Sequence, residues 1–218
     1  MLKGILIAAA LLAVTGSAFA GDLSSVGTVG VEAVTDYSYA RSLNTQNWDA
    51  SHIGLVGLQL NAGSLGSVAV EAGDTQRVAT FRLNYTTFAV NYANGFKVGS
   101  VGVVGAVSYT DQTGDLWFRG NNSSLPVNTV AGTVELNAPL FSNVKGFVDY
   151  SRGYTWSGNI NSFYNNAAAV TSVDTNGAAV GAYVNLGKSF IVKAGYTRSF
   201  GDVGPNTQGV LVSAGYKF

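Results

Sequence analysis

Few residues of this sequence have the chemistry of a catalytic site. His52 is the single histidine, with Ser51 and Asp49 near it, and there is no cysteine. Acid–base and nucleophilic catalysis both need a base held beside its partner group. Adjacent residues of a strand point to opposite faces, so Ser51 and His52 are not expected to pair. We therefore expect no catalytic residue, and not an enzyme.

The acidic residues do not form a metal site either. Asp36, Asp49, Asp111 and Asp115 stand near predicted loops, without the close carboxylate spacing of a calcium loop. The absence of cysteine excludes thiolate ligands and disulfide bonds. A formal net charge of +0 and the absence of a basic cluster argue against nucleic acid as a partner. We expect no metal, no cofactor and no nucleic acid.

The composition differs from that of a soluble domain. Charged residues make up 11% of the chain, against about 25% in typical soluble proteins. Apolar residues alternate with small or polar ones in ten segments, a spacing that predicts β-strands. The segments span residues 27–39, 53–61, 67–73, 77–92, 100–110, 129–138, 144–156, 178–186, 190–200 and 207–218. Alternation on this scale, with no long apolar run, is typical of an antiparallel up-and-down transmembrane β-barrel.

About ten strands are expected, with eight or twelve as alternatives. The connections alternate in length, and Asn94-Gly95 has the sequence of a tight hairpin turn. Longer loops are expected at residues 40–52, 111–128 and 157–177. In the fourth segment the alternation slips by one residue near Thr86-Thr87, which predicts a β-bulge with Tyr85 on the outer face. A soluble sandwich is the alternative, but its polar face would be rich in charge.

Aromatic residues recur at the ends of the apolar face. Aromatic belts suit the two membrane interfaces, where a ring is apolar at one end and hydrogen-bonded at the other. The predicted girdle comprises Tyr37, Tyr39, Tyr92, Tyr109, Tyr150, Tyr154, Trp156, Phe190, Tyr196, Tyr216 and Phe218.

The opposite face of the segments places eight charged residues in the lumen. They are Glu32, Glu71, Arg82, Glu135, Lys145, Asp149, Lys193 and Lys217. Such charges could form a constriction that selects small solutes, or a network of pairs that fills a narrow barrel. Eight-stranded barrels are filled by their side chains, and ten strands enclose only slightly more space. The size therefore favours the filled lumen.

The N-terminus has the three parts of a secretory signal peptide. Lys3 precedes an apolar run from Gly4 to Val14, and Ala18-Phe19-Ala20 offers a cleavage site. The apolar run is shorter than the roughly 20 residues that a spanning helix needs. We expect residues 1–20 to be cleaved and residues 21–218 to form a single barrel domain.

The C-terminal strand ends in an aromatic residue. Its alternating residues are Val210, Val212, Ala214, Tyr216 and Phe218. This end resembles the C-terminal insertion signal of bacterial outer-membrane proteins. The resemblance implies assembly by the barrel-assembly machinery in a Gram-negative outer membrane. Across the chain, the pattern resembles a small, porin-like outer-membrane barrel, without a motif that identifies a functional family.

Two functions fit these features. The first is a small porin-like channel for passive diffusion of small solutes. The alternative is a non-conducting structural or surface-interaction barrel that displays loops 111–128 and 157–177 to a surface ligand. Trp117-Phe118 and Phe163-Tyr164 lie in those loops among small polar residues, a setting that suits protein or glycan contact. Membrane lipid is the expected partner in both.

Overall fold

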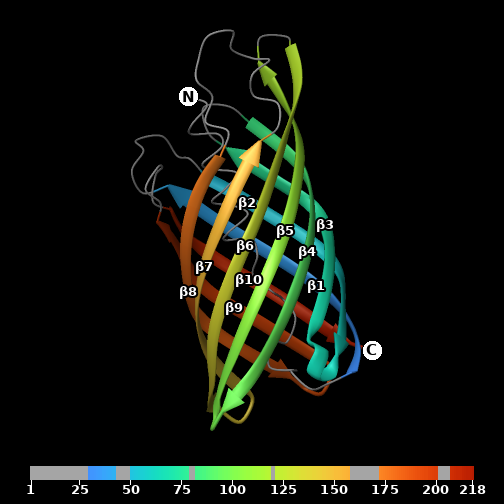
Figure 1. The fold of residues 1–218 in the computed structure, drawn as a ribbon, viewed down its shortest axis with the longest axis vertical. Helices are drawn as coiled ribbons and strands as arrows, with labels where there is room; N and C mark the ends of the chain where they lie inside the picture. The colour runs from blue at the N-terminus through green and yellow to red at the C-terminus, as the bar shows by residue number, and fades with distance from the viewer. Residues whose placement is uncertain (1–28, 43–49, 79–81, 119–120, 158–171, 201–206) are drawn as a thin grey trace.

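The chain forms a closed antiparallel barrel of ten strands (Figure 1). The structure is a computed structural model that describes residues 29–42, 50–78, 82–118, 121–157, 172–200 and 207–218. Each strand pairs with the next along the chain, and β1 pairs with β10 to close the ring. The predicted fold class and the expected number of strands are confirmed. The predicted signal peptide lies outside the described residues.

The strands are long enough to cross a membrane when tilted. They are β1 (Val29–Ser42), β2 (Ala50–Ala62), β3 (Ser67–Val78), β4 (Arg82–Val98), β5 (Val101–Phe118), β6 (Asn121–Phe141), β7 (Val144–Ser157), β8 (Ser172–Leu186), β9 (Phe190–Phe200) and β10 (Thr207–Lys217). A short 3-10 turn, η2 (Gly63–Leu65), joins β2 to β3. No helix among the described residues is long and apolar enough to span a bilayer.

Burial alternates along each strand, and the outside is apolar. In β10, Leu211 and Ser213 are buried, whereas Val210 and Val212 are exposed. Most buried polar side chains are small or hydrogen-bonding residues that face the interior of the ring, while valine, leucine, tyrosine and phenylalanine cover the outside. A polar inside and an apolar outside are the pattern of a barrel that lies in lipid.

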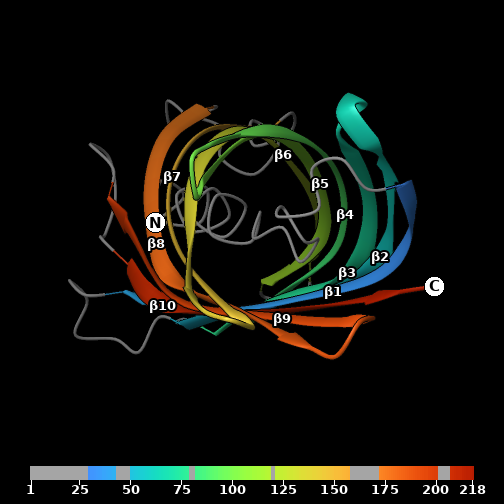
Figure 2. The same cartoon turned by 90° about the horizontal axis from the view of Figure 1, so that it is seen from below.

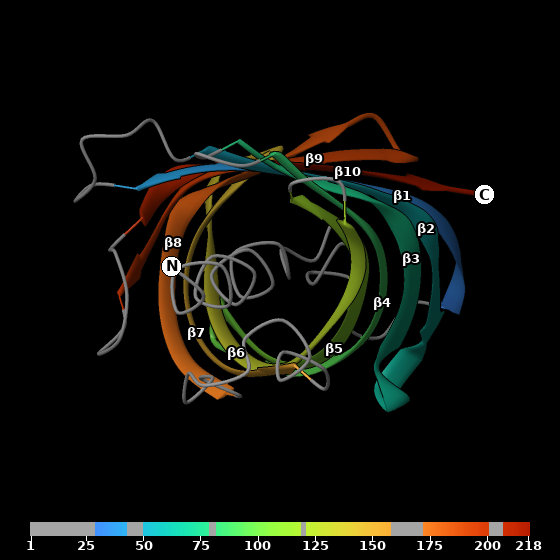
Figure 3. The same ribbon diagram turned by 90° about the horizontal axis from the view of Figure 1, so that it is seen from above.

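The ring is narrow. Following the strand pairings once around the barrel returns to β1 about twelve residues further along. With ten strands spaced as in ordinary sheets, this stagger implies a backbone radius of about 10 Å. The views along the barrel show the ring of strands (Figures 2 and 3). Side chains that point inward from facing walls therefore occupy much of the interior.

The bulge predicted in the fourth strand is absent. β4 pairs with β3 and with β5 in unbroken register through Thr86 and Thr87. The alternation continues across this point, so that Tyr85 is buried on the inner face and Phe88 is exposed. An inward tyrosine fits because Gly114 on β5 leaves room, and a Cβ atom there would come within 2.8 Å of Tyr85 Cε1.

The turn between β4 and β5 lies further along the chain than predicted. Asn94 pairs with Gly105 inside the sheet, and the strands continue to Val98 and from Val101. Gly99 takes a positive φ of 62° at the turn, a conformation that favours glycine. The prediction of a hairpin turn at Asn94-Gly95 is therefore wrong, because the residues that follow it continue the pairing of both strands.

The predicted loop at 111–128 is mostly strand. β5 and β6 remain paired from Asp111↔Asn128 to Phe118↔Asn121. This hairpin is drawn in green and extends beyond the other strands (Figure 1). Of the loop predicted at 157–177, residues 172–177 belong to β8 and residues 158–171 lie outside the described residues. The β5–β6 extension is rich in small and polar residues, so its sequence lacks the strong apolar alternation that predicts a strand. For this reason it was predicted as a loop.

Candidate functional site in the barrel lumen

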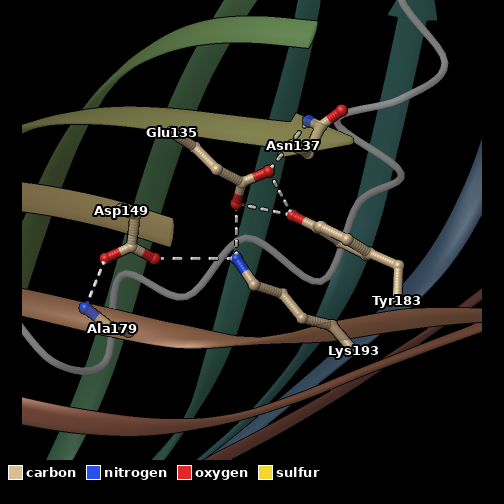
Figure 4. Close-up of polar contacts among 6 residues, drawn as sticks. All are labelled: Glu135, Asn137, Asp149, Ala179, Tyr183 and Lys193. Carbon is tan, nitrogen blue, oxygen red and sulfur yellow. Dashed lines mark hydrogen bonds and ion pairs between the residues drawn. The ribbon is translucent and has the colours of Figure 1, made fainter. Parts of the chain in front are cut away.

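Lys193 on β9 holds together one side of the lumen. Its Nζ lies 2.9 Å from Glu135 Oε2 and 4.0 Å from Asp149 Oδ2. Tyr183 OH donates to both oxygens of Glu135, at 2.8 and 2.6 Å. Asn137 Nδ2 donates to Glu135 Oε1 at 3.1 Å. These five residues, here the Lys193 network, come from β6, β7, β8 and β9 and converge on one point (Figure 4).

The Lys193 network is buried and well satisfied. Lys193, Glu135 and Tyr183 are 2%, 1% and 0% exposed. Asp149 Oδ1 accepts a hydrogen bond from the backbone N–H of Ala179 at 3.0 Å. A buried ion pair is tolerated when hydrogen bonds satisfy the remaining lone pairs, as they do at Glu135. This side of the lumen therefore braces four neighbouring strands.

Phe147 lies beside the Lys193 network on the inner face of β7. The Lys193 ammonium lies 4.3 Å from the centroid of the Phe147 ring, close enough for a cation–π contact. The ring covers two glycines of the wall, since a Cβ atom at Gly181 or at Gly195 would come within 2.8 Å of it. Glycine on β8 and β9 thus makes room for an aromatic side chain inside a narrow ring.

The opposite side of the lumen is acidic. Glu32 and Asp36 on β1 and Glu71 on β3, here the acidic cluster, are 0%, 3% and 2% exposed. The carboxyl groups of Asp36 and Glu71 lie against each other. Gly57 on β2 lies between their strands, and a Cβ atom there would come within 2.8 Å of Glu71 Cγ. The missing side chain at Gly57 leaves room for the Glu71 side chain on the neighbouring strand.

Hydrogen-bond donors and a lysine contact only part of the acidic cluster. Asn61 Nδ2 donates to Glu32 Oε1 at 2.8 Å, and Lys217 Nζ lies 3.3 Å from the same oxygen. Asn91 Nδ2 donates to Glu71 Oε2 at 2.8 Å. The other Glu32 oxygen accepts no hydrogen bond from the described residues, and the carboxyl groups of Asp36 and Glu71 contact each other without forming an ion pair in the described part of the chain. These oxygens favour a cation or a proton beside them.

The buried charges of the lumen are mostly negative. Among the described side chains, Glu32, Asp36, Glu71 and Glu135 are buried carboxylates, and Lys193 is the one buried amine. Among the described residues, no group of three or more acidic, histidine or cysteine side chains could hold a metal ion.

The predicted lumen residues do not all gather in the interior. Glu32, Glu71, Glu135, Asp149 and Lys193 lie in the two groups described above, from which sequence reasoning omitted Asp36, Tyr183 and Phe147. Lys145 and Lys217 lie on the inner face toward the short-turn end, where both are partly exposed. The side chain of Arg82 lies outside the described part of the chain.

The predicted aromatic girdle lies on the outer surface, and His52 lies beside it. Tyr37, Tyr92, Tyr109, Tyr150, Tyr154, Phe190, Tyr196, Tyr216 and Phe218 are exposed, and Tyr39 and Trp156 are partly exposed. The His52 ring lies beside that of Tyr39, with centroids 5.8 Å apart and the ring planes tilted by 36°. Asp49 and the side chain of Ser51 lie outside the description. His52 is thus part of an interfacial aromatic contact.

No protein-family model and no curated protein sequence matches this chain. Solved outer-membrane barrels match its fold. The β-domain of the Bordetella autotransporter BrkA aligns with a TM-score of 0.53 and 11% identity, over 87% of this chain and 99% of that one. The transport unit of AIDA-I from Escherichia coli aligns with 0.49 and 11%, over 99% of both chains. The translocator domain of NalP from Neisseria meningitidis aligns with 0.48 and 12%, over 88% of this chain and 89% of that one. The BrkA match shows the outer-membrane type of barrel fold, and identities this low carry the likeness no further.

Proposed function

We propose that this chain is an integral outer-membrane barrel that acts as a small, porin-like pore with a preference for cations. The apolar outer surface, the girdle and the C-terminal Phe218 support insertion in the outer membrane. The predicted signal peptide supports export, with residues 21–218 as the mature domain and the barrel-assembly machinery as the partner in biogenesis.

The observation that carries the pore is the acidic cluster. A lumen closed by its own side chains would pair its buried polar atoms, since unpaired ones are costly. Here the carboxyl groups of Asp36 and Glu71 lie against each other rather than against a cation, and one oxygen of Glu32 accepts nothing from the described residues. A mobile cation would offset the negative charge that remains on the cluster. A negative, narrow passage raises the local concentration of cations and lowers that of anions.

The Lys193 network supports the alternative of a non-conducting barrel. Its tyrosine, lysine and phenylalanine side chains project from one wall of a ring whose backbone radius is about 10 Å. A barrel closed in this way would serve by displaying its surface, including the β5–β6 hairpin, to a ligand. The two functions predict opposite results in a conductance measurement.

The test is the reversal potential of the refolded mature chain in a planar bilayer under a potassium chloride gradient. We expect a cation-selective conductance that the double variant Asp36→Asn/Glu71→Gln, which removes both facing carboxyl groups, makes severalfold less selective. Asp74→Asn is the matched control, because Asp74 is an exposed acid on the outer face of β3. It should leave selectivity unchanged. A folded barrel without conductance would support the alternative, and an equal effect of both variants would refute the role of the lumen acids.

A further inference from the structure

Three tyrosines of the girdle each donate a hydrogen bond to a side-chain amide on the neighbouring strand, on the outer surface of the barrel. Tyr109 OH donates to Asn128 Oδ1 at 2.7 Å, on the neighbouring strand. Tyr150 OH donates to Asn176 Oδ1 at 2.8 Å, again one strand away. Tyr196 OH donates to Gln208 Oε1 at 2.8 Å. In each pair the tyrosine uses the amide oxygen, so the amide nitrogen remains to donate to another group.

Two of these amides lie in line with outward-facing arginines. The register places Arg41 of β1 opposite Gln208 of β10, and Gln208 opposite Arg198 of β9. It also places Arg152 of β7 opposite Asn176 of β8. Arg41 and Arg198 are exposed, and the Arg152 side chain is 69% exposed. We call Arg41, Arg152, Asn176, Arg198 and Gln208 the donor band.

The donor band lies directly beyond lipid-facing residues. Tyr150 and Tyr196 stand one step below it, followed along the strands by the exposed Val180, Val210 and Val212. The band lies at the long-loop end, away from the short turns at Gly99 and Gly187. Guanidinium groups and amide N–H groups both donate to anions, and the arginine fork matches phosphate geometry.

The donor band carries positive charge. It contains three arginines on neighbouring outward faces, and Arg152 lies 3.9 Å from Asp174, whose side chain is 59% exposed. Guanidinium groups gathered in this way attract an anion to this part of the barrel.

We propose that the donor band binds the phosphate groups of a phosphorylated lipid in the membrane leaflet at the long-loop end. The acyl chains of that lipid lie against the valines below the band, and its phosphate accepts from Arg198, Arg152 and the amide of Asn176 on the strand between them. The proposal requires the membrane location of the proposed function but not the pore. A lipid is the occupant because the band faces outward and continues into the apolar surface.

The test is native mass spectrometry of the refolded full chain in detergent, titrated with phosphatidic acid and, separately, with phosphatidylcholine. We expect preferential binding of phosphatidic acid, weakened about thirtyfold in R152Q/R198Q, because each surface arginine contributes to the attraction of anionic headgroups. K97Q/K188Q is the matched control, since it removes two exposed positive charges at the short-turn end. Binding to this control should equal that of the parent chain.

Further measurements decide whether the donor band binds the lipid phosphate. The conservative R152K/R198K variant keeps the charge and should recover only part of the affinity, because it lacks the bidentate fork. Equal losses in R152Q/R198Q and K97Q/K188Q, or no loss in either, would overturn the proposal. Displacement of the lipid by inorganic phosphate at equal concentration would also overturn it and would indicate a soluble-anion site. Heat-modifiable gel mobility verifies that each barrel is folded, and bilayer conductance reports separately on the pore.

Discussion

Replacing Lys193 by methionine tests whether the Lys193 network stabilises the barrel. Methionine has similar length and no charge, so the change leaves the Glu135 carboxylate buried without its amine. Removing one partner of a buried ion pair costs about 3–5 kcal/mol. Tyr183 and Asn137 still donate to Glu135 in the variant, so we expect a loss of about 3 kcal/mol, at the lower end of that range.

The assay is urea unfolding of the mature chain in phospholipid vesicles, followed by tryptophan fluorescence and heat-modifiable gel mobility. For a chain of this size, the expected loss corresponds to a fall of about 6–12 °C in the melting temperature. Lys97→Met makes the same change at an exposed lysine near the β4–β5 turn and should cost almost nothing.

A double variant identifies the cause of the loss. Glu135→Gln/Lys193→Met leaves no charge unpaired, and glutamine still accepts from Tyr183. We expect it to be more stable than Lys193→Met alone, with a coupling energy of about 1–3 kcal/mol. The reasoning would be refuted if Lys193→Met were as stable as Lys97→Met, or if the double variant showed no recovery. Either result would mean that water solvates the lumen well enough to replace the pair.

Two further predictions concern packing and assembly. Gly195→Ala, where the atom nearest to a new Cβ is Cζ of Phe147 at 2.8 Å, should push this ring from the wall and destabilise the barrel by about 1–3 kcal/mol in urea unfolding. Gly132→Ala, where a Cβ atom meets nothing within 4 Å, should be neutral, and equal stability of the two variants would contradict the close fit. Deleting Phe218, whose side chain is 81% exposed beyond β10, should leave unassembled protein in the periplasm by cell fractionation, while Phe96→Ala assembles normally. Normal membrane levels of the deletion variant would show that the chain end is an ordinary strand.

Alternation in the sequence was enough to predict the barrel and most inward positions. A side chain's face depends only on its parity along a strand, so Glu135 and Lys193 could each be assigned to the lumen. Their contact could not be predicted, because they lie on β6 and β9 and meet only through the pairing register of three successive strand pairs. The contact between Glu135 and Lys193 therefore depends on the pairing register and not on the parity of either strand alone.

One error has its physical origin in a glycine of the wall. Tyr85 was expected outside because the alternation was interpreted as slipping by one residue after it, but Gly114 on the facing strand gives its ring space inside. Phe147 also lies inside over glycines, namely Gly181 and Gly195. An aromatic residue opposite a glycine can occupy a narrow lumen, and that pairing is not apparent from either strand alone. Asp36 has the parity of Glu32, but it was grouped with the acids near the loops and was therefore left out of the predicted lumen residues.

The two proposals depend on the same register, which β9 shows most directly. Lys193 is buried and points inward, whereas Tyr196 and Arg198 are exposed and point outward. A shift of one residue in the pairing of β9 would expose the ammonium to lipid and turn the guanidinium into the lumen. Charge exposed to the membrane core costs several kcal/mol, so both side chains oppose the shift. The ion pair inside and the arginine at the interface therefore fix this strand in place, so that Arg198, which is proposed to bind lipid, also helps to specify the fold.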